Sequence, residues 1–173
     1  LSFYSHGQTR FNPDDEFSIE TEISFMQKVH GEYGVWYKNV GSTHPEHGIL
    51  TKPVIICEGI DFTSEMDFSE LYEQMEDPGG VSFLRELRNQ GYDIVILNLL
   101  DNTGAILKNS RLFIALLEEI NSILESNGSN RRSTVIGVSM GGLVTSCALK
   151  MMEDRGDDHD VELLITYDTP HKG

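Results

Sequence analysis

A serine flanked by glycines at two-residue spacing is the part of the sequence best suited to chemistry. The run 137–142 reads Gly-Val-Ser-Met-Gly-Gly, which gives Gly137-x-Ser139-x-Gly141. This spacing is that of a nucleophile elbow, a sharp strand-to-helix turn that lifts a serine hydroxyl clear of a sheet. The strained backbone of such a turn leaves no room for bulk two positions to either side, which explains the glycines. Ser139 is therefore the candidate nucleophile.

The segments on either side of Ser139 supply the context that this motif requires. Residues 134–138 are apolar and rich in β-branched side chains, which predicts a buried strand, and residues 143–152 predict a helix. The N-terminus of that helix would aim the backbone N–H of Met140 at a developing oxyanion. The alternative is a glycine-rich turn with an inert serine, and the matching context favours the nucleophile.

Length and composition indicate one globular domain over residues 1–173, with an irregular lead-in at residues 1–15. Lys+Arg 13 against Asp+Glu 28 gives a net charge of −15, which argues against nucleic acid and anionic membranes as partners. No apolar run approaches the roughly 20 residues of a membrane span, so we expect no integral membrane segment. No signal-peptide pattern is present. We expect a soluble protein, and its compartment stays open, secretion or the periplasm included.

The elements that must position Ser139 can be read from hydrophobic periodicity. Residues 16–25 alternate apolar and polar side chains, which predicts a half-exposed antiparallel strand. We predict a turn at residues 30–34 and a second strand over 35–40, which together form a hairpin at one edge of a sheet.

From residue 53 onward, buried strands alternate with helices. This alternation predicts a mostly parallel sheet with right-handed crossovers and helices on its faces, beside the antiparallel N-terminal edge. The predicted strands are 53–57, 92–100, 134–138 and 161–167, and the predicted helices are 68–75, 81–90, a segment with apolar residues from Leu112 to Leu124, and 143–152.

Two further runs accompany the elbow in chain order. The strand at 54–57 leaves through Glu58-Gly59-Ile60, and residues 168–173 read Asp-Thr-Pro-His-Lys-Gly. With the elbow they resemble the α/β-hydrolase superfamily and, within it, the lipase-like esterases, which often have His-Gly after the first of these strands and Pro-His-x-Gly after the sixth. The resemblance covers about residues 16–173 and implies an α/β-hydrolase-like three-layer sandwich.

The sequence departs from that family in two respects. Glu58-Gly59 replaces the usual His-Gly, so strand order carries the assignment of this loop. The family usually places its catalytic acid after the seventh strand and its histidine after the eighth, whereas this sequence stops after the sixth. The resemblance therefore implies an incomplete core domain with the last strands missing.

The resemblance also implies roles for individual residues. The backbone N–H groups of Met140 and Ile60 are the expected oxyanion donors. A serine needs a base to take its proton, and His171 leaves a strand at the expected active-site end, although the family's histidine at this position is usually structural. Asp168 ends the sixth strand, where some hydrolases carry their acid and where an ordinary turn carboxylate is the alternative.

Other polar clusters favour bland interpretations. His44 and His47 flank a glutamate, but a proline lies between them and the sequence has no second cluster of ligands. Residues 153–160 form an acidic loop without the spacing of an EF-hand. We therefore expect solvated loops, no metal and no organic cofactor. Cys57 and Cys147 fall inside apolar segments, which favours buried free thiols.

The hypothesis that follows is a serine hydrolase of the lipase or esterase type. The intact protein would cleave a carboxylic ester of a lipid-like small molecule through an acyl-Ser139 intermediate, and the chain alone, lacking the usual histidine, would be inactive. The segment 161–167 would be an unprotected edge strand, covered by a second copy or a partner chain. A non-catalytic binding or scaffold module with a hydrolase fold, and an acyltransferase or amidase, stay open as alternatives.

Overall fold

The computed structural model describes residues 12–24, 27–58, 68–76, 82–100 and 105–171. No helix in these ranges is long and apolar enough to cross a membrane. Every strand and helix predicted from residue 53 onward is present, with ends shifted by a few residues. The elements are β1 (Asp15–Ser24), β2 (Gln27–Trp36), β3 (Pro53–Cys57), α1 (Phe68–Met75), α2 (Phe83–Asn89), β4 (Asp93–Leu99), α3 (Ile106–Ser126), β5 (Ser133–Val138), α4 (Met140–Arg155) and β6 (Val161–Tyr167).

The strands form one mixed sheet in the order β1-β2-β4-β3-β5-β6. β2 is antiparallel to both β1 and β4, whereas β4, β3, β5 and β6 are parallel neighbours. The predicted parallel sheet with an antiparallel N-terminal edge is thus confirmed. Because β4 lies on one side of β3 and β5 on the other, the strand order reverses at β3. Open α/β sheets bind their ligands at the carboxyl ends of strands at such a reversal.

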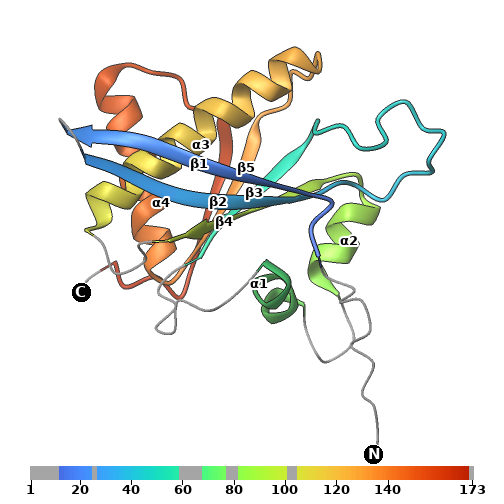
Figure 1. The fold of residues 1–173 in the computed structure, drawn as a ribbon, viewed down its shortest axis with the longest axis horizontal. Coiled ribbons are helices and arrows are strands. Elements are labelled where there is room, and N and C mark those ends of the chain that lie inside the picture. Colours follow the sequence, from blue (N-terminus) through green and yellow to red (C-terminus); the bar gives the residue numbers. More distant parts are fainter. Residues whose placement is uncertain (1–11, 25–26, 59–67, 77–81, 101–104, 172–173) are drawn as a thin grey trace, which may run out of the picture.

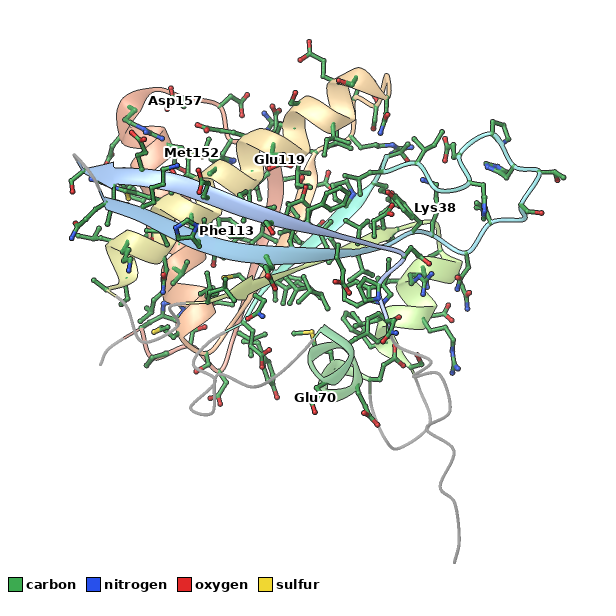
Figure 2. All side chains as sticks on the ribbon, viewed as in Figure 1. Lys38, Glu70, Phe113, Glu119, Met152 and Asp157 are labelled. Atoms are coloured by element: carbon green, nitrogen blue, oxygen red, sulfur yellow. The ribbon has the colours of Figure 1, made fainter. Side chains whose placement is uncertain are left out.

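Helices cover both faces of this sheet (Figure 1), which confirms the three-layer arrangement. On one face, α3 and α4 pack around a core that includes Phe113 of α3, labelled in Figure 2. On the other face, Tyr72 of α1 and Leu84 of α2 pack around Trp36 of β2. β3 is buried along its whole length because alternate side chains enter the two cores.

The N-terminal hairpin corrects the sequence prediction. A turn at 30–34 and a strand over 35–40 are wrong, because β2 runs unbroken from Gln27 to Trp36. A glycine inside a strand often marks the close approach of another group. Here a Cβ atom on Gly31 would lie 2.7 Å from Leu112 Cδ2 of α3. Gly31 therefore lets α3 pack on the strand and does not make a turn.

β6 also differs from its prediction as a buried strand. Leu163, Ile165 and Tyr167 are 50%, 42% and 69% exposed, and these alternate positions share one face of the strand. Leu164, on the opposite face, packs against the α3/α4 core. The core under α1 and α2 takes its buried strand residues from β2, β3 and β4, and Ile136 of β5 packs against it, but it includes no residue of β6. The same face of β6 therefore stays uncovered by the described helices.

A buried ion pair anchors the connection between β2 and β3. Lys38 Nζ lies 3.3 Å from Asp93 Oδ2, at the start of β4, and both side chains are almost fully buried. Lys38 also donates to the Ile49 carbonyl at 2.8 Å, and Asp93 accepts the amides of Thr51 and Lys52 at 2.8 and 3.0 Å. These bonds hold together the two ends of the connection between β2 and β3, residues 37–52. This connection extends away from the sheet in Figure 1 and lies beside the labelled Lys38 in Figure 2.

Candidate active site

The chain turns sharply at Ser139, between β5 and α4. Ser139 has φ 51° and ψ −122°, and α4 begins at the next residue, Met140. A positive φ is costly for a residue with a side chain and is found mainly where the surroundings enforce it. The Ser139 amide donates to the Tyr167 carbonyl of β6 at 2.9 Å. The strand–turn–helix context of a nucleophile elbow is present.

Gly137 and Gly141, on either side of Ser139, let backbone segments touch at distances that a Cβ atom would forbid. A Cβ on Gly137 would lie 2.5 Å from the Cα of Gly142. A Cβ on Gly141 would lie 2.1 Å from the Cys57 carbonyl oxygen, where β3 ends. The first turn of α4 therefore packs directly against the exit of β3, at the reversal of strand order.

Gly142 makes the corresponding contact with the exit of β6. A Cβ atom at this position would lie 2.0 Å from Thr169 Oγ1 and 2.9 Å from Thr169 Cβ. Sequence reasoning gave roles to the first two glycines of the motif and missed this one. The sequence does show a second glycine directly after Gly141, but the residue that it contacts, Thr169, is remote in sequence.

The Ser139 side chain is exposed and makes no capping hydrogen bond to α4. Met140 is the first residue of α4, and the first amides of a helix have no intrahelical acceptor. Its N–H group is thus available to an anion at the helix N-terminus. Ile60, the other expected oxyanion donor, lies outside the described residues. The arrangement offers a free hydroxyl beside at least one backbone donor.

The secondary candidates lie near Ser139 in the fold but make other contacts. His171 Nε2 lies 3.0 Å from Thr166 Oγ1, and the His171 amide donates to the Thr169 carbonyl at 2.8 Å. Asp168 is exposed and has φ 48°. Among the described residues, no hydrogen bond joins Ser139 to a histidine or Asp168 to His171. The structure brings the elbow and the β6 exit together without a Ser–His–Asp chain in this part of the protein.

Cys57 borders the turn but is not suited to nucleophilic attack. Its carbonyl touches Gly141, and its thiol is fully buried. This burial, with the negative charge of Glu58, raises the pKa of the Cys57 thiol to about 12. Because the thiolate is the reactive form of cysteine, Cys57 is inert at physiological pH, and Ser139 remains the candidate nucleophile.

A surface hollow of about 800 Å³ lies elsewhere, beside the end of α3 and the connection to β5. Its lining includes Glu125, Arg131 and Asp160. These residues precede β5 and β6, whereas Ser139 follows β5. The hollow is therefore at the opposite end of the parallel strands from the candidate site.

Comparisons with known proteins agree with this geometry. The family model described as PGAP1-like alpha/beta domain matches residues 98–173, from β4 to the end of the chain. Among solved structures, the mature lipase BlEst2 of Bacillus licheniformis is 21% identical with a TM-score of 0.52, covering 94% of this chain and 49% of that one. No curated protein sequence matches.

Two other solved structures show the same likeness. XC6422 of Xanthomonas campestris, an α/β serine hydrolase, is 14% identical with a TM-score of 0.53, covering 89% of this chain and 60% of that one. Brefeldin A esterase, a bacterial homologue of human hormone-sensitive lipase, is 12% identical with a TM-score of 0.57, covering 95% and 44%. The chain thus spans about half the length of these proteins. The fold of the chain is therefore the α/β-hydrolase fold of these solved lipases and esterases, as the sequence resemblance predicted.

Proposed function

We propose that this chain carries the nucleophile of a serine hydrolase that cleaves carboxylic esters, with an ester or lipid-like small molecule as substrate. The observation that carries the proposal is the conformation of Ser139, whose positive φ presents an exposed, uncapped hydroxyl at the N-terminus of α4. The likeness to lipases and esterases supports the same chemistry. No metal or organic cofactor enters the reaction.

In this mechanism a base takes the Ser139 proton as Oγ attacks the ester carbonyl carbon. The negative charge moves to the carbonyl oxygen, where the amides of Met140 and Ile60 stabilise it. The C–O bond to the alcohol then breaks, and the base returns the proton to the departing oxygen. Water, activated by the same base, hydrolyses the acyl-Ser139 ester and frees the carboxylic acid.

The described hydrogen bonds of this chain give Ser139 no base and supply no acid to orient one. His171 as base, with Asp168 as acid, would require the His171 ring to leave Thr166. We therefore assign His171 to the structure of the β6 exit and place the base and acid outside the described residues. On this proposal the 173-residue chain alone hydrolyses esters poorly.

Hydrolysis of p-nitrophenyl butyrate by the whole protein tests the assignment. We expect Ser139→Ala to lower kcat by at least about 10³-fold, because removal of a triad serine leaves only binding and oxyanion stabilisation. Ser126→Ala is the matched control, since Ser126 is exposed at the end of α3, and its activity should equal that of the parent. Hydrolysis that survives in Ser139→Ala would contradict the proposal.

A non-catalytic binding module is the second candidate, because none of the described histidines forms a hydrogen bond with Ser139. A whole protein that binds esters and never turns them over, with Ser139 intact, would favour it.

A further inference from the structure

The geometry points to Thr169 as a positioning residue that holds the elbow in its reactive conformation through contact with Gly142. The inference rests on the proposed function, because it concerns the same nucleophile. Thr169 lies at the exit of β6, two residues before His171, and would touch neither substrate nor the reacting atoms. It would act through the backbone of Ser139 and Met140.

The first observation is the fit of Thr169 against the first turn of α4. A Cβ atom on Gly142 would lie within 3 Å of three Thr169 atoms, at 2.0, 2.8 and 2.9 Å. The Gly142 amide in turn donates to the Ser139 carbonyl at 3.1 Å. A displacement of Thr169 against Gly142 is therefore passed to the turn by one backbone hydrogen bond.

The second observation is a shared acceptor. The Tyr167 carbonyl accepts the Ser139 amide at 2.9 Å and also the Thr169 hydroxyl at 3.4 Å. This carbonyl fixes the residue with the positive φ to the end of β6. Thr169 thus contacts the elbow on two sides, through the Tyr167 carbonyl and through Gly142.

The third observation explains why Thr169 returns to the elbow when the chain leaves β6. Asp168 has φ 48°, a conformation that aspartate tolerates better than most side chains. The chain bends at Asp168. The His171 amide then holds the Thr169 carbonyl at 2.8 Å, while its ring bonds Thr166 of β6. These two bonds close residues 166–171 into a turn, which holds Thr169 against Gly142 of α4.

A compensating pair of variants tests this contact. In the whole protein, Gly142→Ala should force α4 and the β6 exit apart. We expect the rate at which a fluorophosphonate labels Ser139 to fall at least about 100-fold, because small displacements of reacting groups have effects of this size. Thr169→Gly removes all the crowding side-chain atoms, so the double variant Gly142→Ala/Thr169→Gly should recover at least about tenfold of that loss. Thr169→Ser keeps the hydroxyl and should label within a few fold of the parent, whereas Thr169→Val should be slower.

Hydrogen exchange of the Ser139 amide provides a readout that does not depend on activity. Gly142→Ala should speed the exchange of the Ser139 amide, and the double variant should slow it again. The two variants should be equally stable to heat in the parts of the protein away from α4. Exchange and labelling that stay at parental rates in Gly142→Ala would overturn the inference, as would a folded double variant with no recovery. If the parent protein is not labelled while the amide exchange follows the expected pattern, the assignment of Ser139 as nucleophile would be refuted. The contact between Thr169 and Gly142 would then still stand.

Discussion

At the scale of single residues, Ser139 stands in a conformation that its side chain disfavours. Its φ of 51° is shared by few residues other than glycine. Such backbone geometry costs about 1–3 kcal/mol and persists where surrounding contacts determine it. The Tyr167 carbonyl and the packing of Gly141 and Gly142 are those contacts here. A serine kept there at this cost fits a residue whose hydroxyl is used.

Ser139→Gly measures that cost directly. Glycine adopts the positive φ without strain but loses more entropy on folding, by about 0.5–1 kcal/mol relative to alanine. We therefore expect Ser139→Gly to be more stable than Ser139→Ala by about 1 kcal/mol in urea unfolding. Equal stability of the two variants would show that the turn stores no strain.

Residue chemistry that is local in sequence was predictable, and contacts between remote residues were not. The spacing around Ser139 identified the elbow because the crowding at Gly137 comes from Gly141 and Gly142 of the same turn. The contact of Gly142 with Thr169 joins residues from α4 and the β6 exit, so no local pattern contained it. The bonds that engage His171 are local, to Thr166 and Thr169, but they depend on the positive φ of Asp168, which no pattern marked.

At the scale of elements, the pattern of apolar residues predicted the strands and helices after residue 53 because each has a strong period. The prediction was wrong at β2, where glycines read as a turn. Gly31 instead lies against Leu112 of a helix that comes much later in the chain, since a Cβ atom there would be 2.7 Å from Leu112 Cδ2. The role of Lys38 was also hidden, because its partner Asp93 belongs to another strand and only the fold brings them together.

The Lys38–Asp93 pair makes a prediction about that connection. Removing one partner of a buried ion pair leaves an unpaired charge and typically costs 3–5 kcal/mol. We expect Asp93→Asn to lower the free energy of unfolding in urea by about 3–5 kcal/mol. Asp158→Asn, which removes an exposed partner of Arg132, is the control and should cost less than about 1 kcal/mol. Equal effects of the two variants would contradict a stabilising role for the buried pair.

At the scale of the whole molecule, β6 is the edge strand that the sequence predicted, and one of its faces stays uncovered by the described helices. Edge strands with apolar faces pair with other chains unless something covers them. We therefore propose that a second copy or further polypeptide covers Leu163, Ile165 and Tyr167. The proposal accords with the length of the solved relatives, of which this chain covers about half.

Sedimentation velocity tests self-pairing at this face. We expect the chain to dimerise at concentrations near 100 µM and Ile165→Lys to be monomeric, because a charge on the apolar face opposes its burial. Leu107→Lys is the control, since Leu107 is 61% exposed on α3, away from β6, and this variant should dimerise like the parent. A parent that stays monomeric at this concentration would contradict pairing between copies.

Alkaline pH should destabilise the whole fold through Cys57. Because burial raises the pKa of its thiol to about 12, the unfolded chain loses this proton first, near pH 8.5. The contribution to stability is therefore complete below about pH 8.5 and is lost as pH rises toward 12. One such group gives a slope of about 1.4 kcal/mol per pH unit.

Urea unfolding between pH 8 and 10 should show this slope, and Cys57→Ala should reduce it. The buried Tyr33 and the half-buried Tyr37, whose pKa values are also raised, contribute only above about pH 10. A slope unchanged in Cys57→Ala would place the alkaline sensitivity elsewhere.

The activation of Ser139 is the central claim, and a fluorophosphonate probe with peptide mass spectrometry tests it most directly. The whole protein and the 173-residue chain would be treated in parallel with Ser139→Ala. We expect one adduct on the whole protein, on the peptide that contains Ser139, absent from the variant, and slow or no labelling of the chain alone. No adduct on the whole protein, or an adduct that persists in Ser139→Ala, would contradict the account.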